Sequence, residues 1–376
     1  MNEHSNPHPC GRNPMFSPSL PSRQFACKPD FDECLARVYA WYEQRIVDRP
    51  PVRFHHHNVE YERRRTITGP WKDTRQRWMD VEFQVETFVD SLAGARFLGE
   101  TFPVFWPNLS AVAYNLFLGQ PADFDDVTAW THPWIDDLSR LPPLCVQWGG
   151  EYFQTVEVLT DRALELAAGR FLVGYTDMYA GIDCTAGLRG TERMCLDLVT
   201  DPQGILGLID RAFDEYPAVY GHFDRKLKAH DQLSVTWMNL PSFGTFNVLA
   251  CDFAVNISRQ HFDEVCLPIT RREAELFEHN VYHMDGPGVA KNLDSILTLP
   301  NLAAIQWAQG IGKNLPILQW IPLIRKIQEA GKSVIADLQP GELDEFMRQV
   351  DPRGVMLWVS AEPQDQAEIL ERVKRW

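Results

Sequence analysis

A histidine and an aspartate at the end of one apolar run are the residues best placed to do chemistry. Residues 281–288 read Val-Tyr-His-Met-Asp-Gly-Pro-Gly, so His283 and Asp285 are two positions apart and glycines follow. In an extended strand, residues two apart face the same side, so one ligand can contact both side chains. The pair suits general acid–base catalysis, two ligands of a metal ion, or ordinary hydrogen bonding at the rim of a sheet. Asp252 ends another apolar run and is a third candidate catalytic residue, with helix capping as its alternative role.

Aromatic and amide side chains lie at the ends of other predicted strands. Trp237 ends one apolar run and Asn239 follows it, and Gln306 and Trp307 end another run. Flat indole rings suit a ring-shaped or sugar-like ligand, although each ring could instead pack helices against the sheet. We expect these four residues to bind substrate.

These residues belong to a regular alternation of strands and helices in the second half of the chain. Short apolar runs predict strands at 233–237, 248–254, 280–284, 303–307, 333–336 and 354–359. Helical patterns fill most of the intervals, at 262–279, 316–330, 342–350 and 364–374. Earlier, Asp201 and Pro202 begin a helix as N-cap and first helical residue. The alternation predicts a parallel α/β sheet.

A parallel sheet of this kind is either open or closed into a (β/α)8 barrel, and both forms place ligands at the carboxyl ends of the strands. The chain contains neither GxGxxG nor GxxxxGK[ST], which removes the main support for an open dinucleotide-binding or P-loop sheet. We therefore predict an α/β fold with a TIM-type (β/α)8 barrel. Residues 1–30 are rich in proline and polar residues and predict a flexible arm, followed by one barrel domain over residues 31–376.

Charge and hydropathy narrow the class of partner. Of the 376 residues, 36 are Lys or Arg and 51 are Asp or Glu, a net charge of −15 that disfavours nucleic acids and anionic membranes. No apolar run is long enough to span a bilayer, and the polar N-terminus lacks the apolar core of a secretory signal. The eight cysteines form no CxxC pair. We expect a soluble, cytoplasmic protein that acts on a small molecule.

From about Thr87 to its C-terminus the sequence resembles the uroporphyrinogen decarboxylase (URO-D) superfamily, which includes cobamide-dependent methyltransferases. The resemblance depends on short motifs in a shared order: 183–190 with Leu-Arg-Gly, Asp-Pro at 201–202, 252–268, 283–286, 305–310 and 320–332. It implies a TIM-type barrel whose site uses His283, Asp285 and Asp252, with Arg189 charging the pocket. By analogy it also implies a homodimer.

Two departures from the superfamily pattern bear on the reaction. Porphyrinogen decarboxylases carry an N-terminal Met-Arg-Gln-Ala-Gly-Arg type segment whose arginines bind substrate carboxylates, and residues 74–79, Thr-Arg-Gln-Arg-Trp-Met, match it poorly. Thiol-activating methyltransferases of the superfamily bind zinc through His-x-Cys and a distant Cys. Here His283 aligns with the histidine, Asp285 replaces the first cysteine, and no cysteine follows Cys266.

The resemblance thus implies a URO-D-like lyase that acts on a small carboxylated or methylated substrate. In decarboxylation, Asp252 or Asp285 would stabilise a developing cation while His283 or Arg189 holds a carboxylate. The alternative is a methyltransferase in which His283 and Asp285 hold a divalent metal such as zinc, or polarise a methylated oxygen or nitrogen, with a corrinoid protein as partner. A barrel that binds a ligand without catalysis is the remaining alternative.

Overall fold

The computed structural model describes residue 23, residues 25–55 and residues 69–376. Most of the predicted arm, residues 1–30, lies outside these ranges. The last residues of this segment are packed: Phe25 is buried, and the fully buried ammonium of Lys28 donates to the carbonyl of Phe97 at 2.9 Å. Packing therefore begins before residue 31, the boundary that composition predicts.

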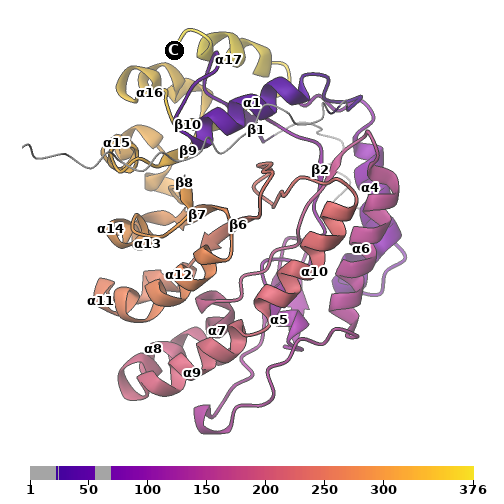
Figure 1. The fold of residues 1–376 in the computed structure, drawn as a ribbon, viewed down its shortest axis with the longest axis vertical. Coiled ribbons are helices and arrows are strands. Elements are labelled where there is room, and N and C mark those ends of the chain that lie inside the picture. The colour runs from indigo at the N-terminus through magenta and orange to yellow at the C-terminus, as the bar shows by residue number, and fades with distance from the viewer. Residues whose placement is uncertain (1–22, 24, 56–68) are drawn as a thin grey trace, which may run out of the picture.

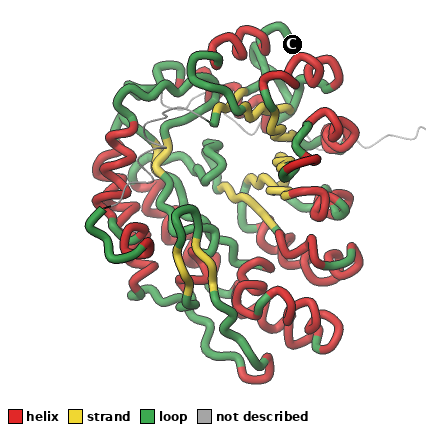
Figure 2. The backbone as a smooth tube through the Cα atoms, turned by 180° about the vertical axis from the view of Figure 1, so that it is seen from behind, coloured by secondary structure: helices red, strands yellow, loops and turns green. Residues whose placement is uncertain are grey.

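The chain is a mixed α/β protein whose strands lie inside a ring of helices (Figures 1 and 2). The described strands are β1 (Val52–Phe54), β2 (Val104–Phe105), β3 (Ala122–Phe124), β4 (Ala129–Thr131), β5 (Leu172–Val173), β6 (Phe246–Ala250), β7 (His279–Asp285), β8 (Leu302–Ala308), β9 (Ser333–Leu338) and β10 (Val355–Val359). The helices are α1 (Phe31–Tyr42), α3 (Thr74–Trp78), α4 (Val81–Ser91), α5 (Ala113–Phe117), α6 (Glu151–Ala167), α7 (Ile182–Arg189), α8 (Thr191–Thr200), α9 (Pro202–Phe213), α10 (Tyr216–Ala229), α11 (Arg259–His261), α12 (Leu267–Glu275), α13 (Gly286–Ala290), α14 (Leu293–Ile296), α15 (Ile321–Glu329), α16 (Leu343–Gln349) and α17 (Gln366–Val373).

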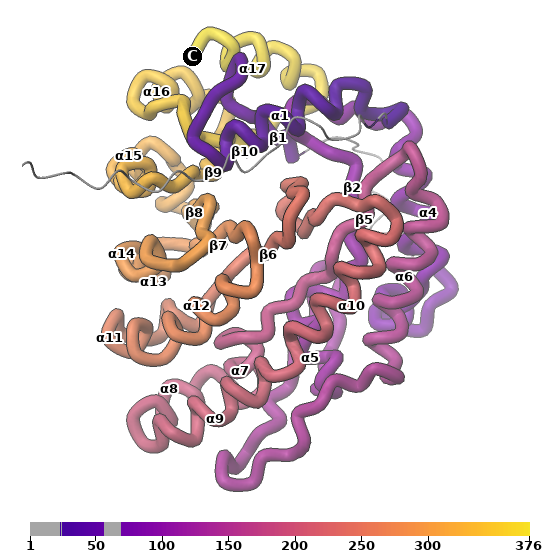
Figure 3. The backbone as a smooth tube through the Cα atoms, viewed as in Figure 1, coloured from indigo at the N-terminus to yellow at the C-terminus, as the bar shows by residue number. Residues whose placement is uncertain are grey.

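Six of the strands form one parallel sheet in the order β1-β10-β9-β8-β7-β6. β2 and β5 form a separate parallel pair, and β3 and β4 form an antiparallel hairpin. In Figures 1 and 3, helices α11 to α17 cover one side of the six-stranded sheet, and α4, α6 and α10 lie across the molecule from them. The parallel sheet confirms the predicted α/β class.

The predicted strand at 233–237 is the clearest difference from the sequence analysis. This segment makes only an isolated bridge between Ser234 and Ser242, and its Val235 carbonyl accepts a hydrogen bond from the Tyr175 backbone N–H at 2.9 Å. The predicted strand at 248–254 is shifted, because β6 ends at Ala250 and Asp252 begins a 3-10 turn, η2 (Asp252–Asn256). Asp201 caps α9 as predicted, since its side chain accepts from the Gly204 backbone N–H.

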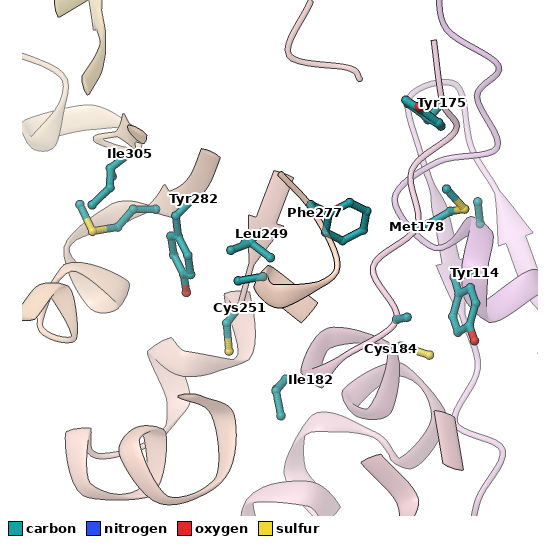
Figure 4. Close-up of a cluster of buried hydrophobic side chains, with 14 of the residues drawn as sticks. Tyr114, Tyr175, Met178, Ile182, Cys184, Leu249, Cys251, Phe277, Tyr282 and Ile305 are labelled. Carbon is teal, nitrogen blue, oxygen red and sulfur yellow. The ribbon is translucent and has the colours of Figure 1, made fainter. Parts of the chain in front are cut away.

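Alternate residues of the sheet enter two different cores, as the two-residue period of a strand requires. Leu249, Tyr282 and Ile305 pack in the core beneath the surrounding helices, and Figure 4 shows them together. Residues of the opposite parity, such as Val248, Val281 and Ala304, pack in a second core with α1. The face that carries Val281 also carries the site, because His283 and Asp285 share its parity.

Candidate functional site

A cavity of about 810 Å³ opens where the chain leaves the parallel strands. Its walls come from the segments that follow β2, β5 and β6, from the last part of β7, from α7 and from the β3–β4 hairpin. The residues on which the argument below depends are Trp106, Trp130, Asp177, Tyr179, Asp183, Trp237, Asp252 and His283. The cavity therefore lies at the carboxyl ends of the strands, where the sequence analysis placed the ligand.

Three predicted site residues meet at this edge. Asp252, His283 and Asp285 each offer one ligand atom, and these atoms lie within 4.8 Å of one another. His283 and Asp285 extend from the same face of β7, and Gly286 follows them at φ 78°, a left-handed conformation that favours glycine and turns the chain into α13. The imidazole is partly buried, and Asp252 and Asp285 both keep contact with solvent. One nitrogen and two carboxylate oxygens at this spacing can hold a divalent cation.

The orientation of the His283 ring is fixed by the neighbouring strand. In the β7–β8 register His283 lies opposite Gln306, and its Nδ1 is 2.6 Å from the Gln306 Oε1. An amide oxygen accepts, so Nδ1 carries the proton and Nε2 keeps its lone pair for a ligand. The Trp237 indole packs edge-on against the imidazole, with ring centroids 5.3 Å apart, and donates its N–H to the Tyr179 hydroxyl at 2.7 Å. Gln306 and Trp237 therefore position His283.

Asp252 is held by a residue from another part of the chain. The Asp183 carboxylate at the start of α7 accepts hydrogen bonds from the backbone N–H groups of Asp252 and Phe253, both at 2.9 Å. Burial and the nearby charge of Asp252 raise the pKa of Asp183 to about 6, although these two hydrogen bonds oppose the shift. Burial also raises the pKa of Asp252; His283 counteracts this effect and Asp285 adds to it. The pKa of Asp252 therefore depends on the charges of both other members of the cluster.

Asp177 is a cavity residue that the sequence analysis did not single out. It is 7% exposed, and among the described residues it has no hydrogen-bond or ion-pair partner. Burial alone raises the pKa of its carboxyl to about 8. The available signal was weak, since Asp177 follows a strand of only two residues, β5, in a stretch that carries no clear periodicity. A buried carboxylate without a partner is costly, so its presence in a cavity wall points to function.

The cavity wall is acidic and aromatic. The described lining residues include Asp177, Asp183 and Asp252 but neither lysine nor arginine. Indole and phenol rings of Trp106, Trp130, Trp237 and Tyr179 also line it. This chemistry favours cations and neutral rings over anions.

Two predicted substrate-binding residues have structural roles instead. Arg189 is not among the residues that line the cavity, because its guanidinium forms a two-point ion pair with Asp197 at 2.5 and 3.1 Å and also donates to the carbonyl of Ile135. Asn239 clamps the backbone of Phe102: its Oδ1 accepts from the Phe102 N–H and its Nδ2 donates to the Phe102 carbonyl, each at 3.0 Å. Both side chains therefore bond to other parts of the protein, and neither lines the cavity.

Trp307 lies in the core of the protein and not at the predicted site. It is fully buried, belongs to the core beneath the helices, and packs edge-on against Trp320 with ring centroids 4.8 Å apart. Adjacent residues of a strand point to opposite faces, so Gln306 reaches His283 and Trp307 cannot. Of the predicted substrate-binding residues, Trp237 lines the cavity and Gln306 contacts His283.

Comparison with known proteins gives a fold relationship. No protein-family model and no curated protein sequence matches the chain. Among solved structures, a methyltransferase from Methanosarcina mazei is similar, with a TM-score of 0.62 over 91% of this chain and 98% of that chain, at 10% sequence identity. Within the described residues, no helix combines the length and the apolar character needed to cross a bilayer.

Proposed function

We propose that this protein is a methyltransferase of the URO-D superfamily in which Asp252, His283 and Asp285 hold a divalent metal ion beside a small methylated substrate. The observation that carries the proposal is the convergence of these three ligand atoms within 4.8 Å of one another, with Asp252 and His283 at the wall of the cavity. The similar fold of a methyltransferase adds support. A corrinoid protein is the proposed partner that accepts the methyl group.

The donor set suits a divalent ion. An imidazole nitrogen and carboxylate oxygens bind zinc, manganese or iron, whereas a thiolate-rich set selects softer ions. Asp285 stands where the thiol-activating relatives carry a cysteine, so this site favours activation of an oxygen or nitrogen substrate over a thiol. When bound, the ion would act as a Lewis acid on the methylated atom.

The chain's own residues would orient the metal ligands and hold the substrate. Gln306 fixes the His283 tautomer, and Asp183 fixes the backbone of Asp252. The rings of Trp106, Trp130, Tyr179 and Trp237 form the aromatic wall of the cavity. This aromatic wall would align the methylated atom with the metal ligands. In the transfer, the bond from the methyl carbon to oxygen or nitrogen breaks, its electron pair stays on that atom, and a nucleophile on the corrinoid partner forms the new bond to carbon.

A closed barrel is part of the same proposal. The six-stranded sheet and the β2–β5 pair approach each other through hydrogen bonds outside the ladders, including that from the Glu100 N–H to the Val52 carbonyl at 2.6 Å. On the other side, the Tyr175–Val235 bond continues from β5 toward β6. These links support a ring of strands around the second core.

Decarboxylation has no comparable support. A substrate with several carboxylates needs cationic partners, and the described lining provides none apart from His283. Arg189, which the superfamily resemblance placed in the pocket, is occupied by Asp197.

Metal binding is the first test. Chelator-treated protein is titrated with Zn²⁺, Mn²⁺ and Co²⁺ by calorimetry, with Co²⁺ absorption as a spectroscopic readout. We expect one ion per chain, and at least tenfold weaker binding in Asp285→Asn, Asp252→Asn and His283→Ala. Asp337→Asn, which removes an acid at the end of β9 outside the cluster, serves as the matched control.

Methyl transfer is the second test. Metal-loaded protein is incubated with reduced cobalamin and a panel of methoxylated and N-methylated compounds, and methylation is followed by absorbance. We expect turnover with at least one compound and its loss in His283→Ala. Ligand binding without turnover would support the non-catalytic barrel, and metal binding unchanged in all three variants would place the ion elsewhere.

A further inference from the structure

Asp177 and the aromatic wall have no part in holding the metal. Asp177 lies nine-tenths buried at the cavity wall, and no described cation, backbone N–H or hydroxyl compensates its carboxylate. Uncompensated burial of an ionised carboxylate is strongly unfavourable. A cationic ligand would supply the missing partner; without one, the carboxyl must be solvated from the cavity or stay protonated.

The surroundings of Asp177 indicate which ligand would supply that partner. Tyr179, two residues along the chain, lines the same cavity as Asp177 and the metal-ligand candidates Asp252 and His283. Its hydroxyl accepts the Trp237 N–H, which fixes both rings beside His283. Aromatic faces next to a carboxylate are the arrangement that binds alkylated ammonium groups, through cation–π attraction and charge pairing.

The remaining charges agree with this assignment. The described cavity lining contains three aspartates and one histidine, and the whole chain has a net charge of −15. A cavity lined mainly by acids raises the local concentration of cations and repels carboxylates and phosphates. The volume of about 810 Å³ leaves room for an ammonium group at Asp177 and a methylated atom at the metal ligands of one small molecule.

We infer that the ligand of this cavity carries an organic ammonium group, which pairs with Asp177 between the rings of Tyr179 and Trp237. That this ligand is also the substrate rests on the proposed methyltransferase function. The ammonium end would orient the molecule so that its methylated atom faces Asp252, His283 and Asp285. Binding itself requires no bond to form or break.

The test compares ligands of one shape and different charge. Choline, its neutral carbon isostere 3,3-dimethylbutan-1-ol and the anion 3,3-dimethylbutyrate are titrated into full-length protein at pH 8.5, by calorimetry and tryptophan fluorescence. We expect choline to bind at least tenfold more tightly than the alcohol, and the anion to bind more weakly still. Equal affinity for choline and the alcohol would overturn the inference.

Substitution locates the cation. Asp177→Asn preserves shape and removes the charge, so we expect the tenfold preference for choline to disappear while circular dichroism and metal binding stay unchanged. Asp214→Asn, at the exposed end of α9, is the control acid and should retain the preference. An undiminished preference in Asp177→Asn would show that the cation binds elsewhere.

Failure of this inference and failure of the proposed function are separable. His283→Ala should lose metal and methyl transfer but keep its preference for choline. Ammonium binding in a protein that takes up no metal would leave the cation site standing and remove the methyltransferase. Methyl transfer without any preference for cations would support the methyltransferase function and remove the cation site.

Discussion

The imidazole Nδ1 of His283 and the side-chain Oε1 of Gln306 are 2.6 Å apart across the β7–β8 register. Because this contact leaves Nε2 free, Gln306 determines which nitrogen of His283 meets a ligand. Second partners of metal-binding histidines contribute roughly 10- to 100-fold to metal affinity. Gln306 should therefore affect the affinity for a metal ion that it does not contact.

We predict that Gln306→Met weakens divalent metal binding by about 10- to 100-fold while the protein stays folded. Calorimetric titration with Zn²⁺ measures the affinity, and thermal denaturation checks the fold. Gln309→Met is the matched control, since the Gln309 amide donates to the carbonyls of Leu315 and Asp337 and does not contact His283. Equal metal affinity in wild type and Gln306→Met would remove Gln306 from the site.

The buried Asp177 carboxyl predicts a pH-dependent stability. Its folded-state pKa is about 8, above the value of about 3.9 for an unfolded chain, so the folded state binds its proton more tightly. The penalty for ionising it is absent below about pH 4, grows as the pH rises, and is complete above pH 8. Asp177→Asn should therefore stabilise the ligand-free protein increasingly between pH 4 and pH 8, by up to a few kcal/mol.

Urea denaturation of wild type and Asp177→Asn at pH 5, 6.5 and 8 tests this prediction. The other ionisable residues of the cavity are the same in both proteins, so the difference between the two proteins reports on Asp177. A difference that shrinks toward pH 8 would contradict the assignment of Asp177 as a buried acid without a partner.

The sequence could predict the meeting of His283 and Asp285 because a two-residue spacing at a strand end fixes their common face. The α/β class and the position of the cavity followed from the alternation of strands and helices in the same way. The same rule allows only one of Gln306 and Trp307 to face the site, but the rule does not say which one. That choice depends on the β7–β8 register, a non-local property.

Other site features depend on contacts between distant segments. Asp183 and Asp252 are 69 residues apart in sequence, so no local pattern predicts the hydrogen bond between them. Arg189 resembles a substrate ligand in sequence, yet it is neutralised by Asp197 on the next helix. Asp177 follows a strand too short to show periodicity, so only its burial in three dimensions reveals it.

We predict that Arg189→Met lowers stability without changing ligand or metal affinity. The Arg189 and Asp197 side chains are 11% and 10% exposed. Removal of the guanidinium leaves the Asp197 carboxylate buried without its partner, which should lower the free energy of unfolding by roughly 3 kcal/mol. Urea denaturation measures the loss, and the double variant Arg189→Met with Asp197→Leu should recover part of it. A folded Arg189→Met protein that no longer binds choline would restore Arg189 as a ligand contact.

Two tryptophans at strand ends should respond in opposite ways to substitution. Trp307 is fully buried against Trp320, so Trp307→Ala should destabilise the protein by about 3 to 5 kcal/mol and leave ligand affinity in the folded fraction unchanged. Trp237 is half-buried at the cavity beside His283, so Trp237→Ala should weaken choline binding by about 1 to 2 kcal/mol, the value of a desolvated cation–π contact. Parallel denaturation and calorimetry on both variants separate the roles. If Trp307→Ala weakened choline binding as much as Trp237→Ala, the division between core and cavity faces of the sheet would be wrong.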